Sequence, residues 1–451
     1  MSTRLTLIGV ALIVLCSAVF YYYDQFNDDP ATSISIYDKP SSVFVVPADQ
    51  WYDFDLRILP PRGWAMVPPE VSTQKRPFVG PPSDFLGSQA CAECHAERHA
   101  SFSKTAHHKT SRPPSEQSIH GKFSDDRNEL KTQFADLRFE MTREDEGFSQ
   151  SLYFEEDGKT YSQRFPFGVV IGSGKIAQTY LHWVKNDSYQ MHVSYFRDNE
   201  HWTNSPGYPD GTADFARPAL PRCFECHVTY IASEPGSVNS YDKESLIHGV
   251  SCERCHGPGR DHVEHHRCHP TSDVASFITN PHTLSRERNI DICSQCHSGG
   301  GESLTLPFSF RPGDKLAQHL KLEAANSAGG SVHAGNQRVR MQLSRCYTES
   351  DTLSCASCHD PHVEERGNTV LFSERCIKCH QPDACGLSEK LGTGIRENCI
   401  DCHMRLRDDE GTRVETPNQV RFPQLRDHLI AVWPEMDVDS FKPSSVKDSD
   451  P

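Results

Sequence analysis

The chain has 451 residues, with 46 basic and 61 acidic side chains and a formal net charge of −15. This acidic balance, without a basic stripe, argues against a nucleic-acid-binding protein and suits a soluble body that docks on a basic partner. Hydrophobic residues make up only 36% of the chain, so either part of it is disordered or a non-protein group supplies part of the core.

The N-terminus carries an uncharged stretch, LTLIGVALIVLCSAVFYYY at 5–23, that is long enough to span a bilayer. Its closing tyrosines occupy the place of an interfacial aromatic belt. Because no small-residue cleavage site follows, we expect residues 1–23 to be an uncleaved transmembrane anchor, with a cleavable signal peptide as the alternative. Either reading predicts that the body of the chain is exported, and the anchor reading, which we favour, gives a membrane-anchored protein with its haem domain in the periplasm.

Residues 24–85 are rich in proline, with PP pairs at 60–61, 68–69 and 81–82. Such a composition favours extended chain over a packed domain. We expect a stalk or an arm that wraps the body.

The first CxxC pair, in CAECH at 91–95, is followed at once by histidine, and so is every other CxxC pair of the chain. A zinc site or a redox dithiol needs the cysteines but no histidine at that position. Covalent haem c needs all three, because two thiols add to the haem vinyl groups and the imidazole becomes the proximal iron ligand. The predicted thioether cysteines are Cys91, Cys94, Cys223, Cys226, Cys252, Cys255, Cys293, Cys296, Cys355, Cys358, Cys376, Cys379, Cys399 and Cys402. The predicted proximal ligands are His95, His227, His256, His297, His359, His380 and His403. The sequence thus predicts seven covalently attached haems c.

The second axial ligand of each iron decides between electron transfer and chemistry at an open face. Of 24 histidines, seven follow a CxxC pair, so histidine is the expected second ligand rather than one of the seven methionines. The candidates, chosen because they lie near or between the motifs, are His107, His108, His248, His262, His333, His362 and His428. Sequence spacing leaves open which of them faces which iron.

Residues 86–118 form the first haem segment, and residues 119–215 contain no CxxCH. There the apolar residues alternate, as at Leu137, Phe139 and Met141, which predicts an antiparallel β insert. YLHWV and YQMHVSYF, separated by KNDS, predict a hairpin. His182, His192 and His201 lie in this insert, where we expect hydrogen-bonded or surface histidines.

The rest of the chain divides by motif density. Residues 216–300 hold three motifs with little regular structure expected, 301–345 form a spacer with a helix around KLAQHLKLEAA, and 346–430 hold three more motifs. Residues 431–451 are polar and predict a disordered tail. The expected fold is therefore a multihaem cytochrome whose porphyrins form the core, covered by short helices and loops. Cys346 and Cys385 flank the fifth and sixth motifs and form either a disulfide or two free thiols.

The stretches FLGSQACAECH, GSGKIAQTYL, HWTNSPGY, GVSCERCHGPGRDH, QLSRCYTES, LSCASCHDPH and CIDCHM resemble the cytochrome c-554/c-prime-like multihaem family. Together they cover most of residues 86–430. The resemblance implies a periplasmic electron-transfer protein with closely packed, mostly bis-histidine haems, and it implies that His262, His362 and His428 are distal ligands. TPNQVRFPQLRDH lacks the further histidine that relatives often carry there, so one ligand departs from the family pattern.

We therefore expect an anchored seven-haem cytochrome that passes electrons between redox partner proteins. The alternative is an oxidoreductase that acts on a small nitrogen or sulfur compound at one open haem. The lysine variant of the motif, CxxCK, is absent, which argues against one class of multihaem reductase. The donor, the acceptor and the oligomeric state stay open.

Overall fold

The computed structural model describes residues 84–124, 127–145, 147–198, 200–299, 301–322 and 336–433. The predicted anchor 1–23, nearly all of the arm 24–85, His333 and most of the tail 431–451 lie outside these residues. Within the described ranges no helix is both long and apolar enough to cross a membrane.

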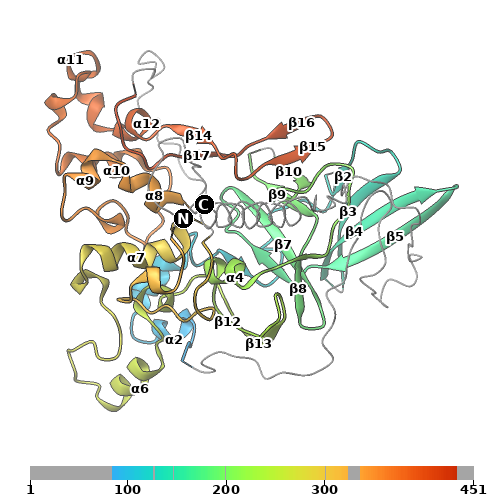
Figure 1. Cartoon of the computed structure of the whole chain (residues 1–451), viewed down its shortest axis with the longest axis horizontal. Coiled ribbons are helices and arrows are strands. Elements are labelled where there is room, and N and C mark those ends of the chain that lie inside the picture. The colour runs from blue at the N-terminus through green and yellow to red at the C-terminus, as the bar shows by residue number, and fades with distance from the viewer. Residues whose placement is uncertain are drawn as a thin grey trace, which may run out of the picture.

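Short helices dominate one half of the molecule and strands the other (Figure 1). The α-helices are α2 Ser88–Ala92, α3 Ala96–Phe102, α4 Pro221–His227, α5 Glu253–His256, α6 Arg260–Cys268, α7 Arg286–His297, α8 Gln337–Gln342, α9 Arg345–Thr348, α10 Thr369–Ile377, α11 Ser388–Leu391 and α12 Cys399–His403. The 3-10 turns are η2 Pro281–Thr283, η3 Leu316–Gln318, η5 Cys355–Ser357, η6 Pro382–Ala384 and η7 Gly392–Arg396. The strands are β1 Ser111–Arg112, β2 Glu129–Lys131, β3 Leu137–Glu144, β4 Gly147–Glu156, β5 Lys159–Pro166, β6 Val169–Ile171, β7 Ala177–Val184, β8 Asp187–Gln190, β9 Val193–Phe196, β10 His201–Asn204, β11 Arg217–Pro218, β12 Val228–Ser233, β13 Tyr241–His248, β14 Leu406–Asp408, β15 Val414–Thr416, β16 Gln419–Arg421 and β17 Gln424–Arg426.

Two antiparallel sheets occupy the stretch where alternating residues predict strands. One is a meander in the order β2-β3-β4-β5, and its β4–β5 hairpin projects from the body (Figure 1). The other runs β1-β6-β7-β8-β11, with β9 paired to β7 and β10 paired to β9. The predicted single strand YQMHVSYF is broken into β8 and β9, because Met191 N donates to Tyr180 O and the chain then moves to a different part of β7.

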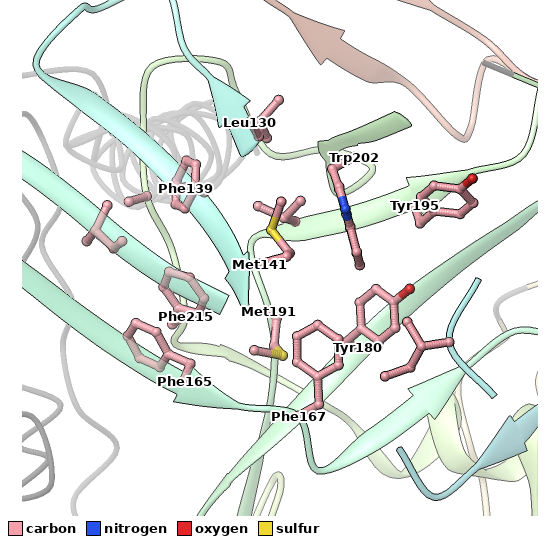
Figure 2. Packing of buried hydrophobic residues seen from close by; sticks show 14 of the residues in the cluster. Leu130, Phe139, Met141, Phe165, Phe167, Tyr180, Met191, Tyr195, Trp202 and Phe215 are labelled. Atoms are coloured by element: carbon pink, nitrogen blue, oxygen red, sulfur yellow. The ribbon is translucent and has the colours of Figure 1, made fainter. Parts of the chain in front are cut away.

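An apolar cluster fills the space between these sheets (Figure 2). Leu137, Phe139 and Met141 on β3 are almost fully buried, as their alternation predicts. Phe165 stacks on Phe215 with ring centroids 3.6 Å apart, and Trp202 donates its indole N–H to Lys122 O at 2.7 Å. A conventional core thus stabilises the β region.

The motif-bearing segments contain more regular structure than the sequence predicts. β12 and β13 form a hairpin between the second and third motifs, and α7 carries the fourth. The helix predicted around KLAQHLKLEAA is wrong as far as the structure describes that stretch: only η3 forms. Leu316 and Leu320 are buried, but Leu304 N donates to His319 O and Lys321 N donates to Glu302 O, so this chain runs antiparallel to 302–304 instead.

A C-terminal arm, β14 to β17, ties the two halves together (Figure 1). β14 pairs with β17, and β15 pairs with β16 at the far end of the arm. There Asn204 donates to Glu415 O at 2.9 Å, and Arg421 pairs with Asp198 at 2.7 Å. The arm therefore leaves the helical half, reaches β10, and returns.

Candidate haem-binding sites

The CxxCH motifs lie on helical turns. The backbone N–H of His95, His256 and His380 donates to the carbonyl of the first cysteine of the same motif, at 2.9, 2.9 and 3.0 Å. An i to i+4 bond of this kind brings residues i, i+3 and i+4 to one face. The motif spacing thus presents two thiols and one imidazole on the same side of the turn, which is the donor set of a covalent haem c.

Cysteines of different motifs also lie close together. The thiols of four pairs of cysteines from different motifs are close enough to influence each other's pKa: Cys91 and Cys252, Cys226 and Cys296, Cys293 and Cys355, and Cys376 and Cys399. In the last pair, the neighbouring Cys376 is the main reason that the pKa of Cys399 falls to about 6. The motifs are therefore neighbours in space as well as in sequence.

Neither Cys346 nor Cys385 is part of a disulfide, and the described residues contain no other disulfide. Cys346 interacts electrostatically with Cys358 and Cys376, while Cys385 interacts with Cys402. Of the two alternatives that the sequence leaves open, the structure therefore has the free thiols and no disulfide between Cys346 and Cys385.

Three histidines that follow a CxxC pair each face a histidine from elsewhere in the chain. The ring centroids are 6.2 Å apart for His107 and His297, 6.1 Å for His256 and His362, and 6.1 Å for His359 and His428. Two imidazoles bound on opposite sides of one metal, with metal–nitrogen bonds of about 2 Å, place their centroids about 6 Å apart. The geometry of these rings fits an iron held between each pair.

The spacing does not suffice alone. His99 and His108 are also 6.1 Å apart, and neither follows a CxxC pair. What distinguishes the other three pairs is that each combines one motif histidine with one of the candidate second ligands.

The second ring nitrogen of several of these histidines has a defined acceptor. Nδ1 donates to a backbone carbonyl in His256, to Thr279 at 2.9 Å, and in His403, to Ala431 at 2.9 Å. The Nδ1 of His428 likewise donates to Arg426 O at 3.2 Å. Donation from Nδ1 fixes the tautomer that leaves the Nε2 lone pair for a metal, and such outer hydrogen bonds orient metal-binding imidazoles.

The same feature occurs at two further candidates and at one motif histidine. His262 Nδ1 donates to Ser276 O at 2.7 Å, and His362 Nδ1 donates to the Asp360 carboxylate at 2.9 Å. His227 Nδ1 is hydrogen-bonded to the Thr110 hydroxyl at 2.8 Å. Sequence reasoning missed these acceptors because no motif spacing marks them.

The His107 side chain is exposed although many protein atoms surround it. Burial among these atoms lowers its pKa to about 4, with a further contribution from His297. Burial also lowers the pKa of His428, to about 4.

The remaining candidates are less well defined. His108 packs on Phe102 with ring centroids 5.7 Å apart. Burial lowers the pKa of His248 to about 4, and its Nδ1 is buried without a hydrogen-bond partner. The ring centroids of His262 and His266 are 4.6 Å apart, and His266 in turn interacts electrostatically with His95 of the first motif.

The histidines of the β insert differ from these. His182 Nε2 donates to Phe215 O at 2.7 Å. His192 Nε2 lies 3.0 Å from Asn204 Oδ1, and its Nδ1 accepts from Asp214 N at 2.9 Å. His182 and His192 are thus hydrogen-bonded core residues.

A C-terminal strap, defined here as residues 427–433, serves two motifs. It carries His428 opposite His359, and it supplies Ala431 O to His403. Trp433 also donates its indole N–H to His403 O at 3.1 Å. One short segment therefore positions ring nitrogens at the fifth and the seventh motif.

A buried ion pair anchors this strap to α8. Arg340 donates to both carboxylate oxygens of Asp427, at 2.8 and 2.7 Å, and both side chains are at most 1% exposed. Ser344 Oγ donates to His428 O and accepts from Ile430 N. Burial disfavours ionisation of Asp427, but the hydrogen bonds from Arg340, Leu429 N and Arg407, together with the charge of Arg340, outweigh it and lower the Asp427 pKa.

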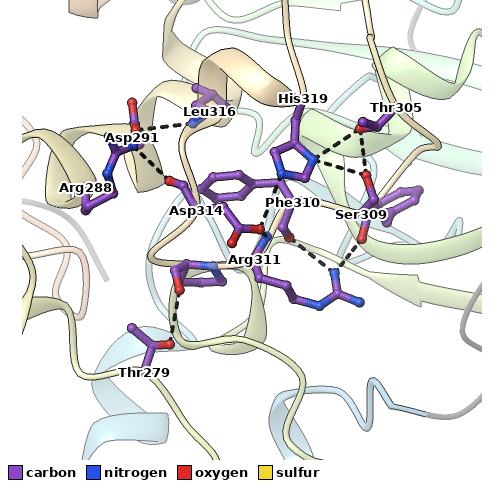
Figure 3. A network of polar contacts seen from close by, with 12 residues as sticks. Thr279, Arg288, Asp291, Thr305, Ser309, Phe310, Arg311, Asp314, Leu316 and His319 are labelled. Atoms are coloured by element: carbon purple, nitrogen blue, oxygen red, sulfur yellow. Dashed lines mark hydrogen bonds and ion pairs between the residues drawn. The ribbon is translucent and has the colours of Figure 1, made fainter.

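A second polar network holds the acceptor of His256 (Figure 3). Thr279 Oγ1 donates to Pro312 O at 3.2 Å, in a loop that Asp314 closes by accepting from Arg311 N at 2.9 Å. Arg288 on α7 donates to Asp314 O at 3.1 Å. The network thus connects the helix of the fourth motif to the histidine of the third.

Comparisons with known proteins relate this chain to multihaem cytochromes. The family described as cytochrome c554 and c-prime matches residues 180–257. The dissimilatory sulfite reductase MccA of Wolinella succinogenes is 22% identical over 82% of this chain and 57% of its own length. The multihaem cytochrome MtrA of Shewanella baltica is 25% identical over 41% of this chain and 53% of its own. The chain thus spans a little more than half the length of both relatives.

Two solved structures have a partial likeness. The outer cell wall cytochrome OcwA aligns with a TM-score of 0.48 at 16% identity, over 77% of this chain and 80% of that one. The undecahaem cytochrome from the S-layer of Carboxydothermus ferrireducens aligns with a TM-score of 0.36 at 16% identity, over 79% of this chain and 53% of that one.

Proposed function

The chain is a multihaem c-type cytochrome, and from that premise we propose that it conducts electrons along a row of seven covalently attached haems c, one at each CxxCH motif. The haem irons supply the one-electron chemistry. The chain's own residues attach the haems, provide axial imidazoles, and bury the centres.

The observation that carries this proposal is the contact between attachment sites. Thiol contacts link the first motif to the third, the second to the fourth, the fourth to the fifth, and the sixth to the seventh. Electrostatic interaction of Cys255 with Cys293 links the third to the fourth, and that of Cys358 with Cys376 links the fifth to the sixth. The resulting row runs from the first motif to the third, fourth, fifth, sixth and seventh motifs. The second motif branches off this row at the fourth motif.

The histidine pairs support a carrier role for three of these centres. We assign His107 to the fourth motif, His362 to the third and His428 to the fifth as second axial ligands. Paired histidine ligands leave no open coordination position, which suits electron transfer rather than catalysis at those irons. His262 is assigned to the first motif, and His108, His248 and His333 are left for the second, sixth and seventh.

The proposed setting is the periplasm, with residues 1–23 as a membrane anchor and redox partner proteins as electron donor and acceptor. The uncharged run at the N-terminus supports the anchor, and haem attachment outside the cytoplasm fits the large number of cysteines. Separation of membranes from soluble fractions tests this placement directly.

A haem count tests the central claim. The pyridine haemochrome of the purified chain should give seven haems per polypeptide, and its mass should exceed the polypeptide mass by seven haems. A count of zero or one contradicts the proposal. Electron paramagnetic resonance then checks the axial ligands: low-spin ferric signals are expected, and His428→Ala should convert one centre to high spin while His201→Ala should not.

A second candidate function is the reduction of a small oxyanion, because one relative is a dissimilatory sulfite reductase. It requires one iron with an open face. A persistent high-spin ferric signal in the unmodified protein that changes on adding sulfite or nitrite would favour this function over the carrier.

A further inference from the structure

A group of basic side chains gathers where two distant segments meet. β1 pairs with β6, with Arg112 opposite Val170, and Gly172 N donates to Thr110 O at 2.6 Å. Beyond this turn, Arg197 N donates to Ile176 O at 2.9 Å. The segment 109–120, the loop 172–176 and the end of β9 therefore converge.

His120 lies at the centre of this convergence. Its backbone N–H donates to Gln178 Oε1 at 2.8 Å, and the loop backbone packs directly on its ring. Gly174 has φ +79°, and a Cβ there would lie 2.6 Å from His120 Nε2. Only glycine allows this close approach, so the loop and the ring are held together.

Arg112 is half-buried beside His120 and has no carboxylate partner within the part of the chain that the structure describes. Its guanidinium donates to Ser118 O at 3.1 Å and to Gln117 O at 3.5 Å, and its Nε is buried without a hydrogen-bond partner. A guanidinium keeps its charge at every physiological pH, so this positive charge is neutralised only by neighbours.

The charges around His120 are all of one sign. His120 interacts electrostatically with Arg112, Arg197, Lys109 and Lys175, and its burial together with these cations lowers its pKa. Among the described residues, Glu364 is the only carboxylate in an ion pair with any of the five, at 3.8 Å from Lys175. Like charges gathered at a half-buried place raise the free energy of the folded state unless an anion joins them.

The cluster adjoins the second and fourth motifs. Thr110, between Lys109 and β1, is hydrogen-bonded to His227 of the second motif, and His107 faces His297 of the fourth. We propose that Arg112, His120 and Lys175, flanked by Lys109 and Arg197, bind an oxyanion beside this pair of haem sites. A guanidinium fork, an imidazole and an ammonium suit the oxygens of a carboxylate or of a small inorganic oxyanion.

This oxyanion has two possible sources with the same chemistry: the propionate carboxylate of a neighbouring haem, or a free small anion. The inference rests on the proposed function in that the haems must be present, so each variant is first checked for seven haems. A deficient count in the unmodified protein overturns the proposed function, whereas the tests below address the cluster alone.

The first arm measures free anion binding by calorimetry and by the Soret band, with sulfite and nitrite as probes of the holoprotein. If the source is a free anion, the unmodified protein binds with saturation, and Arg112→Gln weakens binding about tenfold or more. Lys175→Gln, at an exposed position, should weaken it less. Arg138→Gln is the matched control, because Arg138 lies on β3 and stacks on Tyr153.

The second arm applies if no probe binds. Spectroelectrochemistry between pH 5 and 8 then follows the haem reduction potentials. If the source is a propionate, Arg112→Gln raises the pKa of that carboxyl and moves the pH-dependent part of one potential to higher pH, and Arg112→Lys restores part of it. If Arg112→Gln changes neither anion binding nor the pH dependence of any potential, with seven haems attached, the proposal is wrong.

Discussion

The β insert and the C-terminal motif segment bury their interiors in different ways. The cluster between the sheets contains sixteen buried apolar residues, among them Phe139, Tyr180 and Trp202. Between residues 346 and 433, where the structure describes every backbone position, Val414 and Leu429 are the only buried hydrophobic side chains. Three of the seven motifs lie in that second stretch.

This difference shows that apolar burial is scarce in the C-terminal motif segment and not in the β insert. The β insert has the apolar packing of an ordinary domain, and hydrophobic burial stabilises it without a cofactor. The C-terminal segment has no such packing, so we expect its fold to depend on the proposed thioether and iron–imidazole bonds and on buried ion pairs. Each prediction below tests this division, from the largest expected effect to the smallest.

Loss of the haems should destabilise the C-terminal segment far more than the β insert. When the chain is produced without haem attachment, we expect amide protection to be lost throughout 346–433 and largely retained in β3, β4 and β7, because only the latter bury a continuous apolar core. Hydrogen exchange with mass spectrometry measures both regions in one experiment, with the haem-loaded chain as the reference. Equal protection, or equal loss, in both regions would contradict the division.

Truncating one phenylalanine in each region tests the same division residue by residue. Phe139→Ala should lower the free energy of unfolding of the β insert by about 3–5 kcal/mol, because Phe139 is fully buried and stacks on His192 at 4.6 Å. Phe372→Ala should cost far less in denaturant unfolding of the same region. Since the Phe372 ring lies 5.2 Å from that of His359, it should instead shift the spectrum of one haem.

The strap tests the role of ion pairs. Asp427→Asn leaves the buried Arg340 without its counter-ion and should destabilise the strap by about 3 kcal/mol. Release of the strap should weaken the pairing of His428 with His359, and we expect a fraction of high-spin ferric haem by electron paramagnetic resonance. Asp408→Asn, an exposed carboxylate on β14, serves as control. If the electron paramagnetic resonance spectrum of Asp427→Asn were unchanged, the idea that the strap holds a ligand of this iron would be wrong.

Acid should affect the two regions in different pH ranges. Burial lowers the pKa of His182 to about 4 and that of His192 to about 3, below the ordinary histidine value of about 6.5. The unfolded chain therefore binds protons that the folded β insert excludes, so its stability should fall as the pH drops from about 6.5 towards 4.

Asp427 has the opposite charge but also a lowered pKa, so its contribution is present above the ordinary aspartate value and is lost only below about pH 4. Urea midpoints at pH 7, 6, 5 and about 3.5, followed by exchange in each region, distinguish the two ranges. His182→Gln should flatten the response of the β insert. If, as the pH is lowered, the strap loses its exchange protection at a higher pH than the β insert does, this assignment is contradicted.

The sequence predicts the local part of this picture well. Alternation at Leu137, Phe139 and Met141 reflects a strand with one face in a core, and the CxxCH spacing reflects one helical turn. Both are properties of a few consecutive residues. The predicted helix is wrong over the described residues 315–322, because the buried leucines there also fit a 3-10 turn followed by a bridge to 302–304, a long-range contact that periodicity does not contain.

The site depends more heavily on distant parts of the chain. His107, His362 and His428 each lie opposite a histidine of a different motif, and no spacing rule gives those partners. The carbonyls of Thr279 and Ala431, which fix two ring tautomers, carry no side-chain signal at all. The basic cluster was missed for the same reason, since Arg112 and Lys175 meet only through the pairing of β1 with β6.

The pairing of His359 with His428 has a consequence for how the chain is completed. Synthesis proceeds from the N-terminus, so under the proposed ligand assignment His107 exists before its partner His297, whereas His428 is among the last of the described residues to be made. The centre at the fifth motif must therefore wait for nearly the whole polypeptide, while the fourth finds its partner already made. Under that assignment, full coordination of the iron would report that synthesis has passed the strap, and a product cut short before the strap would keep a vacant axial position.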